Sequence, residues 1–309
     1  MLHSNNSYQN SANGKLLITG EYLVLDGATA LAVPLQFSQK MKINFVEGNS
    51  ITWKAADSEG VWFEAKFKTK TLDIETSTNH ETAKILQQIL LNAQLLKQKP
   101  LFGQAAEVET FMNFNKNWGL GSSSTLISLI ANYLGVNSHK LLQLSFGGSG
   151  YDVACAENNK PLFFKLIDNK PHVQQADFFP NFRQQIYFVY LGKKQNSREG
   201  IEHYKKNRNR LSNSILQQIS TISHNLATTD SIFQFMEYMK IHEKIISEII
   251  DIQPVKEKFF PDFNGEVKSL GAWGGDFVMA VSNLESSNIS EYFKRKNYNI
   301  IFNYNNIVL

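Results

Sequence analysis

A glycine-rich segment at residues 118–124 (WGLGSSS) runs without a break into an apolar stretch that ends before Gly135. The apolar residues of that stretch recur at helical spacing, so the sequence predicts a loop that leads directly into a helix. Glycines let backbone N–H groups approach an anion closely, and a helix N-terminus adds unpaired donors and a partial positive charge. The three serine hydroxyls can also donate to phosphate oxygens. The segment therefore indicates a phosphate-binding loop, with an ordinary serine N-cap after a glycine turn as the alternative.

This loop matches neither of two common phosphate-binding signatures. No Lys-Ser or Lys-Thr pair closes it, which excludes a Walker A motif. The third glycine of a dinucleotide-binding GxGxxG motif is missing as well. The kind of phosphate site must therefore be inferred from other segments of the chain.

Two further segments place one charged side chain beside glycines. Residues 147–152 (GGSGYD) set Asp152 just after a flexible turn, where a carboxylate can orient or deprotonate an attacking hydroxyl. Residues 14–22 (GKLLITGEY) set Lys15 at the start of a strand-like run, where an ammonium can neutralise a phosphate or lower a neighbouring pKa. A turn aspartate and a solvated lysine are the respective alternatives.

A fourth segment, residues 268–277 (KSLGAWGGDF), is also rich in glycine. Its glycines can let the backbone pass next to a bound phosphate or substrate, and a glycine-rich hairpin turn is the alternative. Trp273 between the glycines is unusual for a plain turn, because a large apolar ring is normally buried.

The remaining pattern predicts an α+β protein. Residues 1–13 are polar and we expect them to be frayed. Strand-like and helix-like stretches alternate after them, and the strand patterns favour a largely antiparallel sheet. We expect strands at 15–20, 21–27, 28–35, 37–47, 61–67, 105–114, 161–166, 171–176, 186–192 and 298–309, with one strand on each side of residues 271–276. We expect helices at 79–97 (N-cap Asn79), 122–134, 139–146, 198–225 and 230–250.

Length and composition indicate a globular chain of two domains. A length of 309 residues corresponds to two domains at about 150 residues each. Pro180 lies among polar residues at 177–184, which predicts domains at 1–180 and 181–309. Hydrophobic residues make up 42% and charged residues 19%, within the globular range.

Charge and cysteine content exclude several classes of function. A net charge of +3 with no basic-aromatic cluster argues against a nucleic-acid partner. The single cysteine, Cys155, excludes a disulfide framework and a cysteine-clustered zinc site. No apolar run approaches about 18 residues and no signal peptide is recognisable, so we expect a cytoplasmic protein without membrane contact. No long apolar seam demands a dimer, so both a monomer and a homodimer stay open.

Together and in this order, the four segments resemble the GHMP kinase family, which includes galactokinase, homoserine kinase, mevalonate kinase and phosphomevalonate kinase. The resemblance spans nearly the whole chain, through residues 14–27, 119–124, 148–152 and 268–276. It implies a two-domain α+β GHMP kinase fold, with an N-terminal domain that resembles a ribosomal-protein domain and a ferredoxin-like C-terminal domain.

The resemblance also implies site residues. Asp152 matches the family's catalytic aspartate, and Lys15 matches the lysine that lies near it. ATP is then the phosphoryl donor, with Mg²⁺ contacted by the Ser123 hydroxyl. The implied ATP-binding residues are Gly119, Leu120, Gly121, Ser122, Ser123 and Ser124.

Within the family, residues 20–22 (GEY) and 274–276 (GGD) are closer to phosphomevalonate kinases than to mevalonate or galactose kinases. A basic loop at 192–199 can meet a substrate that is already phosphorylated, and a solvated basic loop is the alternative. The resemblance therefore implies transfer of the γ-phosphoryl group of ATP to a mevalonate-pathway substrate, with phosphomevalonate as the leading acceptor. The implied substrate-side residues are Glu21, Tyr22, Lys193, Lys194, Ser197, Arg198, Gly271, Ala272, Trp273, Gly274 and Gly275.

Other activities stay open at this point. They are a mevalonate kinase, a sugar or homoserine kinase, and a catalytically silent ATP-binding sensor. Residues 122–151 contain no acidic side chain to serve as the second Mg²⁺ ligand that mevalonate kinases commonly carry. Trp273 also stands where the family usually has glycine, so its ring is expected to narrow the pocket or to stack on a ligand.

Overall fold

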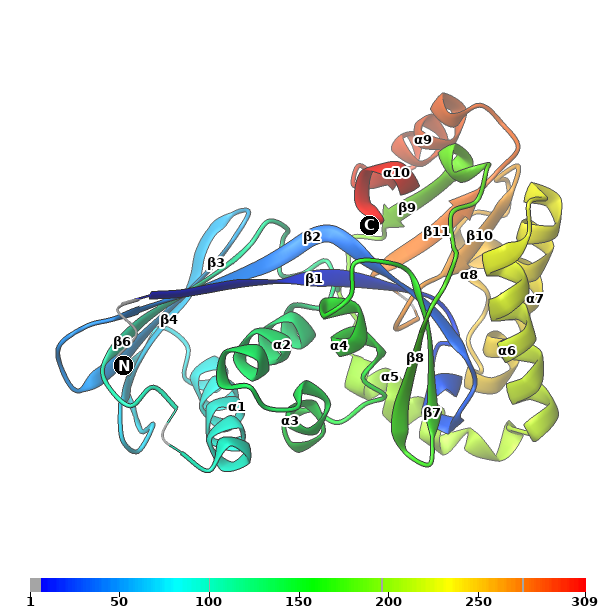
Figure 1. Ribbon diagram of the computed structural model, residues 1–309. Helices are drawn as coiled ribbons and strands as arrows, with labels where there is room; N and C mark the ends of the chain where they lie inside the picture. The colour runs from blue at the N-terminus through cyan, green and yellow to red at the C-terminus, as the bar shows by residue number, and fades with distance from the viewer. Residues whose placement is uncertain (1–6, 100, 196, 274) are drawn as a thin grey trace. The chain divides into compact units, whose positions relative to one another are not determined.

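The computed structural model describes residues 7–99, 101–195, 197–273 and 275–309 (Figure 1). Internal packing divides the chain into two compact units. Unit 1 comprises Met1–Gly14, Phe37–Lys116 and Gly121–Glu157, and unit 2 comprises Lys15–Gln36, Asn117–Leu120 and Asn158–Leu309. Neither unit is a single stretch of chain. The expected domains at 1–180 and 181–309 stay a prediction.

Two long strands belong to both units. β1 (Ser7–Thr19) enters unit 2 at Lys15, and β2 (Ala30–Phe45) leaves unit 2 after Gln36. The two strands pair with each other. The expected strands at 28–35 and 37–47 are therefore one continuous strand.

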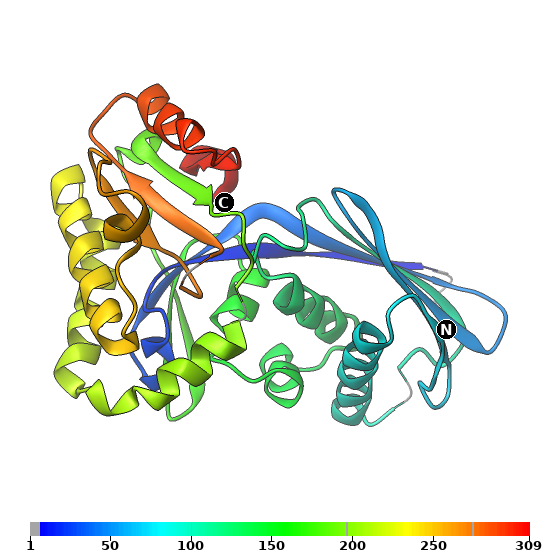
Figure 2. The same cartoon turned by 180° about the vertical axis from the view of Figure 1, so that it is seen from behind.

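Unit 1 is a sheet covered by helices. Its strand order is β5-β4-β3-β6-β2, with β3 and β6 parallel and the other pairs antiparallel. Helices α1, α2 and α3 lie on the same face of this sheet (Figures 1 and 2). The elements are β3 (Ser50–Asp57), β4 (Gly60–Lys68), β5 (Ile74–Ser77), α1 (His80–Lys97), β6 (Ala106–Met112), α2 (Ser122–Leu134), α3 (Ser138–Ser145) and α4 (Tyr151–Ala156).

The core of unit 1 is built from strands in which buried and exposed residues alternate. In β6 every second residue is buried, from Ala106 to Met112, and β3 shows the same period. These strand residues pack against the apolar stripes of α1 and α2, including Leu90 and Ile127. The buried face of the strands and the apolar faces of the helices therefore pack into one apolar layer.

Unit 2 contains the rest of the chain. In this unit β2 pairs antiparallel with β7, and β7 pairs antiparallel with β8. A second sheet has the order β10-β11-β9-β12. The elements are η1 (Leu23–Asp26), β7 (Leu162–Ile167), β8 (Lys170–Gln175), η2 (Arg183–Gln185), β9 (Ile186–Tyr190), α5 (Ser197–Lys206), η3 (Arg208–Arg210), α6 (Asn213–Thr228), α7 (Ile232–Ile250), α8 (Val255–Phe259), β10 (Glu266–Ser269), β11 (Phe277–Val281), α9 (Ser286–Arg295), β12 (Ile301–Asn303) and α10 (Tyr304–Ile307).

Two apolar clusters stabilise unit 2. One lies between the second sheet and helices α8 and α9, with Phe260 and Phe293 at its centre. The other joins η1 to α5, α6 and α7 and includes Leu23, Ile246 and Trp273. The second cluster fixes the glycine-rich segments at 14–27 and 268–277.

Four further expectations about local structure were wrong. β1 begins at Ser7, because polar residues occupy the exposed positions of a paired strand. Residues 23–26 form the 3₁₀ helix η1, which ends at Gly27 in a left-handed conformation, instead of a strand. The expected helix at 198–225 breaks into α5 and α6, where Ser212 caps the new helix. The tail contains β12 and α10, and the helix α9 before it was missed.

Candidate functional site

Lys15 holds the start of the glycine-serine loop. Its backbone N–H donates to the carbonyl oxygen of Leu120 at 2.9 Å, and its Nζ donates to that of Gly119 at 2.8 Å. The hydroxyl of Tyr190 donates to the carbonyl oxygen of Asn117 at 3.0 Å. Strands β1 and β9 therefore fix the loop from two sides, and the ammonium group of Lys15 lies at the loop.

Asp276 packs directly beneath the same loop. A Cβ atom at Gly119, where φ is +72°, would lie 2.7 Å from the carboxylate of Asp276. The backbone N–H of Gln195 donates to this carboxylate at 2.9 Å. Burial raises the pKa of Asp276, and the charges of Lys15 and Lys194 oppose that rise. Only glycine fits at position 119, because both the backbone angle and the space exclude a side chain.

The loop continues in unit 1 as the N-terminus of α2. Gly121 is the N-cap, with φ at +98° and no side-chain cap hydrogen bond. The hydroxyl of Ser124 donates back to the carbonyl oxygen of Gly121 at 2.8 Å, whereas Ser123 is exposed. The first turn contains no acidic residue. The backbone N–H groups of this turn and the Ser123 hydroxyl can therefore bind an anion without repulsion from a carboxylate on the same turn.

The turn that precedes Asp152 is also in unit 1. Gly150 is the N-cap of α4 with φ at +91°, and the His139 ring fills the space where its Cβ would lie. Nε2 of His139 forms a hydrogen bond to the carbonyl oxygen of Ser149 at 3.1 Å. Asp152 is half-buried, and its Oδ1 accepts from the backbone N–H of Val153 at 3.0 Å. A short, locally fixed turn thus presents the carboxylate.

Asp152 lies in unit 1 and Lys15 in unit 2. Their expected proximity, and the passage of ATP across residues 119–124, therefore stay predictions.

Glu21 belongs to a cluster of charged side chains in the interior of unit 2. Its carboxylate pairs with Lys268, and both side chains are fully buried. Glu243 accepts hydrogen bonds from the backbone N–H and the hydroxyl of Ser269, at 3.1 and 2.9 Å. Nε2 of His242 accepts from the backbone N–H of Gly20 at 2.9 Å. The glycine-rich segments at 14–22 and 268–277 are therefore joined through buried polar contacts.

Protonation in this cluster differs from that of exposed side chains. Burial raises the pKa of Glu21 from the usual 4.5 to about 7, although the charge of Lys268 opposes the rise. Burial and the neighbouring Lys268 hold the pKa of His242 well below 6.5, so that its ring is neutral. The carboxylate of Glu21 binds Lys268. The expectation that Glu21 contacts substrate stays a prediction.

Tyr22 adopts a rare backbone conformation. Its φ is +61° and ψ is −47°, and the backbone N–H of Leu23 donates to the carbonyl oxygen of Glu21 at 2.6 Å. This is a strained γ-turn, a feature that clusters at functional sites. The Tyr22 hydroxyl accepts from the backbone N–H of Trp273 at 3.2 Å, and its ring stacks on Tyr204 at 5.6 Å between centroids. These contacts hold the backbone of Tyr22 in its strained conformation.

Trp273 lies in the interior of unit 2. The residue is 6% exposed and packs with Leu23, Ile219 and Ile246 in the cluster of η1, α6 and α7. Its ring therefore contributes to the core of unit 2. The expectation that the ring narrows a pocket or stacks on a ligand stays a prediction.

Other residues are only predicted to lie on the substrate side. Gly275 packs closely against the carbonyl oxygen of Lys193, and Gly271 has φ at +66° beside the buried Ala272. Lys193, Lys194 and Arg198 are exposed. Ser197 begins α5, but its side chain and Gly274 lie outside the described residues. Contact of these residues with a substrate stays a prediction.

Several residues of the site were not found from the sequence. His242, Glu243 and Tyr204 lie on ordinary amphipathic helices, and His139 lies on a short helix. Nothing in the local pattern of these helices marks the four residues. Asp276 was visible as the end of the fourth segment, but its contact with Gly119 depends on the tertiary fold.

The described residues contain no group of three or more His, Cys, Asp or Glu side chains that could hold a metal ion. In the same part of the chain, none of the helices combines the length and apolarity that crossing a membrane requires.

Comparison with known proteins finds similarity in structure only. No model of a known protein family matches the chain, and no curated protein matches it. Phosphomevalonate kinase of Streptococcus pneumoniae, in complex with phosphomevalonate and AMPPNP, is 16% identical, with a TM-score of 0.70 over 96% of this chain and 99% of that one. Mevalonate kinase of L. major with R-mevalonate is 13% identical, with a TM-score of 0.67 over 97% and 96%. Galactokinase of Lactococcus lactis with galactose is 12% identical, with a TM-score of 0.62 over 97% and 93%.

These similarities confirm the fold that the sequence resemblance implied. The chain has the two-domain α+β fold of the GHMP kinases. At 12–16% identity the similarity does not extend to the substrate.

Proposed function

We propose that this protein is an ATP-dependent kinase that phosphorylates a hydroxyl group of a small metabolite. The observation that carries the proposal is the contact of the Lys15 ammonium with the carbonyl oxygen of Gly119, immediately before the uncapped N-terminus of α2. A positive side chain and a row of backbone N–H groups along one glycine loop form a suitable binding site for a nucleotide phosphate.

The reaction joins the acceptor's hydroxyl oxygen to the γ-phosphorus of ATP, while the bond from that phosphorus to the β-phosphate oxygen breaks and ADP leaves. Asp152 accepts the proton of the hydroxyl. Lys15 and the N–H groups of the α2 turn stabilise the charge on the phosphoryl oxygens. Phosphoryl transfer depends mainly on positioning and charge neutralisation, so this set of groups is sufficient.

Mg²⁺ would neutralise phosphate charge when bound. The exposed Ser123 hydroxyl is an oxygen ligand of the kind that Mg²⁺ accepts. Because the described residues lack a cluster of acidic ligands, the nucleotide phosphates and water would supply the other ligands.

We propose phosphomevalonate as the acceptor, with mevalonate next and a sugar or homoserine after it. The GEY and GGD sequences at 20–22 and 274–276 support the first choice. The structural similarity to a phosphomevalonate kinase is consistent with phosphomevalonate, and the similarity to a mevalonate kinase is consistent with mevalonate as the next candidate. We place the enzyme in the cytoplasm, as a monomer or homodimer.

The test is ADP release by the full chain with ATP and Mg²⁺, against phosphomevalonate, mevalonate, homoserine and galactose in parallel. Asp152→Asn should reduce turnover by about 10²–10⁴-fold and leave AMPPNP binding within about twofold, because the carboxylate acts on the acceptor. Near wild-type turnover in this variant would remove Asp152 from the mechanism. If the protein binds AMPPNP but turns over none of the four acceptors, a catalytically silent ATP-binding sensor is favoured instead of a kinase.

A further inference from the structure

Within the described part of unit 1, one face of the sheet is exposed to solvent. Helices α1, α2 and α3 lie on the other face (Figures 1 and 2), where Ile43, Trp53 and Val108 belong to the apolar core. Side chains alternate between the two faces of a strand, so the residues next to these core residues point away from the helices. We call the surface that they form on β2, β6, β3 and β4 the open face.

A row of alternating charges crosses the open face. In register, Lys42 of β2 lies beside Glu109 of β6. Glu109 lies beside Lys54 of β3, and Lys54 lies beside Glu64 of β4. All four side chains are exposed, and in strand order their charges are positive, negative, positive and negative. We call these four residues the charged row.

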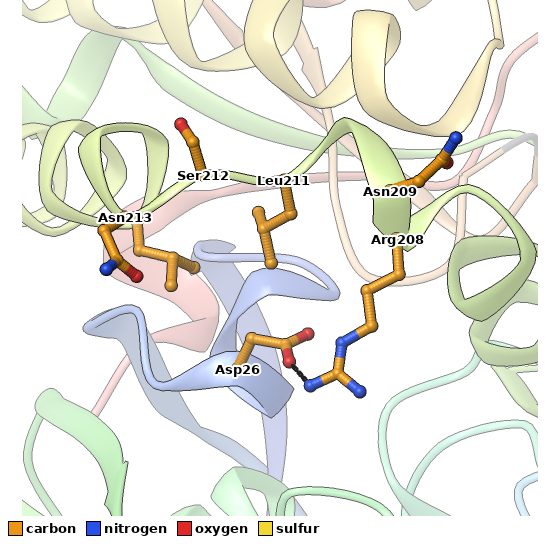
Figure 3. Close-up of a pocket in the computed structure, with 7 residues that line it drawn as sticks. Asp26, Arg208, Asn209, Leu211, Ser212 and Asn213 are labelled. Carbon is orange, nitrogen blue, oxygen red and sulfur yellow. Dashed lines mark hydrogen bonds and ion pairs between the residues drawn. The ribbon is translucent and has the colours of Figure 1, made fainter.

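The side chains of the charged row form no ion pair within the chain. Among the described residues, neither an ion pair nor a hydrogen bond involves any of the four side chains. The pocket between α5 and α6 in unit 2 differs in this respect. There, Figure 3 shows Arg208 pointing toward Asp26, which it ion-pairs and to which the Tyr204 hydroxyl also donates. The carboxylate of Asp26 is therefore satisfied within one chain, whereas the charged row is available to a partner.

The charged row has opposite charges at mirror positions. The boundary between β6 and β3 divides it, with Glu109 and Lys54 next to the boundary and Lys42 and Glu64 one strand further out. Consider a second copy that lies face to face with the first, turned by half a turn about an axis along this boundary. Glu109 then lies opposite Lys54 of the second copy, and Lys42 lies opposite its Glu64. Opposite charges meet along the whole row, as a self-complementary two-fold contact requires.

The same rotation also brings apolar groups together. Phe111 of β6 and Ala56 of β3 lie beside each other in register, two residues along from the charged row. Phe111 is 47% exposed, which is unusual for a large apolar ring. In the face-to-face arrangement each Phe111 lies opposite Ala56 of the other copy. One axis therefore accounts for both the charges and the exposed ring.

We propose that the open face binds a second copy of this chain, in a two-fold dimer whose axis runs along the boundary between β6 and β3. The contact pairs Glu109 of each copy with Lys54 of the other. It lies wholly in unit 1 and does not rest on the proposed kinase activity.

The size of the open face indicates a weak, reversible dimer. Four strands that lie about 4.8 Å apart, with about seven residues each at about 3.3 Å, cover roughly 400 Å² per copy. Twice that area is below the roughly 1,200 Å² at which stable interfaces begin. A hollow of about 610 Å³, lined by Thr52, Lys54 and Glu109 among others, can receive side chains of the second copy. Exposed ion pairs are screened by salt, so the dimer should dissociate as the salt concentration rises.

The first test is sedimentation equilibrium of the full chain at low salt, up to about 200 µM, a range that detects a micromolar dimer. Lys54→Glu puts two carboxylates opposite each other at two places in the dimer, and we expect it to raise the dissociation constant at least about tenfold. Lys205→Glu is the matched control, because Lys205 is an exposed lysine of α5 that pairs with Glu202 outside the open face. It makes the same change of charge, and we expect an effect within about twofold.

The second test exchanges the two charges at the boundary. Glu109→Lys alone should weaken the dimer as much as Lys54→Glu does. The double variant Lys54→Glu/Glu109→Lys again has opposite charges facing each other, and its net charge equals that of the wild type. We expect its dissociation constant to return to within about threefold of the wild-type value. Urea denaturation checks that each variant is folded, because like charges side by side in a sheet cost some stability.

Three results would each overturn the proposal. The first is a wild-type protein that stays monomeric at low salt over the whole concentration range. The second is a dimer that neither Lys54→Glu nor a rise to about 0.5 M salt weakens. The third is a folded double variant that associates no better than the folded single variants. Recovery of the dimer in the double variant would support the proposal, because a general effect of net charge would not produce it.

Discussion

Unit 2 buries a pair of opposite charges in its interior, whereas two ion pairs of unit 1 lie on its surface. In unit 1, Lys66 pairs with Glu75 and Lys68 pairs with Asp73 on the surface, with side-chain exposures between 28% and 58%. Unit 2 instead buries Lys268 with Glu21 at 0% exposure for both side chains. Unit 1 is stabilised by its apolar layer, and its charges contribute little.

This difference indicates what the interior charge of unit 2 does. Burying an ion pair is costly, and apolar residues of similar size often serve stability as well or better. The pair lies where the glycine-rich segments at 14–22 and 268–277 meet, and the neutral ring of His242 holds the backbone of Gly20 beside it. We interpret the cluster as a device that fixes these two segments in one arrangement.

The largest expected effect comes from removing one partner of the buried pair. Lys268→Met leaves the carboxylate of Glu21 without its cation, and we expect the free energy of unfolding to fall by about 3–5 kcal/mol. Urea denaturation of the full chain measures it. The double variant Glu21→Gln/Lys268→Met should recover most of that loss. If the double variant is as unstable as the single one, the pair is not the reason for the destabilisation.

The contact between Gly119 and Asp276 should give the next effect. Gly119→Ala places a methyl group against the carboxylate at a φ of +72°, which we expect to cost roughly 1–3 kcal/mol and to weaken AMPPNP binding. Gly192→Ala is the matched control, because Gly192 has φ at +81° with no atom within 4 Å of the added Cβ. Adding Asp276→Ala to Gly119→Ala should restore part of the binding. If Gly119→Ala and Gly192→Ala lose equal stability, the positive φ angle alone explains the loss and the contact with Asp276 does not contribute.

Glu21 should make the stability of unit 2 depend on pH. Its pKa is about 7 in the folded protein and near 4.5 when exposed, so its contribution is fully present below about pH 4.5. That contribution is lost as the pH rises through 7. Relative to Glu21→Gln/Lys268→Met, the wild-type free energy of unfolding should therefore fall between pH 4.5 and 7. A constant difference over this range would show that Glu21 titrates normally.

The smallest effect is expected in unit 1. Lys66→Ala removes a surface pair, and we expect a change below about 0.5 kcal/mol that decreases further at high salt. A loss above about 1 kcal/mol, measured by the same urea denaturation, would contradict the contrast between the two units.

The sequence predicted those parts of the fold that depend on local signals. Asn79 caps α1, and its side chain accepts from the backbone N–H of Thr82 at 2.9 Å, as its position before the apolar pattern indicated. α2 ends at Gly135 in a left-handed conformation for the same kind of reason. A cap and a helical period lie within a few residues, so no tertiary contact is needed to recognise them.

Long-range contacts determine what could not be predicted. Residues 23–26 have a strand-like composition, but the turn at Tyr22 is held by Trp273 and Tyr204, which are distant in sequence. For the site, the chemical types of Lys15, Asp152 and the serine loop could be proposed from the four glycine-rich segments. The burial of Trp273 and the place of Asp276 beneath Gly119 could not, because each depends on how the chain packs in three dimensions.

The interleaving of the two units also affects how the chain emerges during synthesis. All segments of unit 1 have been translated once Glu157 is made, so this unit can close while the rest is still being synthesised. Lys15–Gln36, which carries Glu21, must wait for the second half of the chain before the buried partner Lys268 exists. The apolar residues of that segment are then exposed on the ribosome for the longest time. We expect this segment to be the one that a nascent-chain chaperone protects.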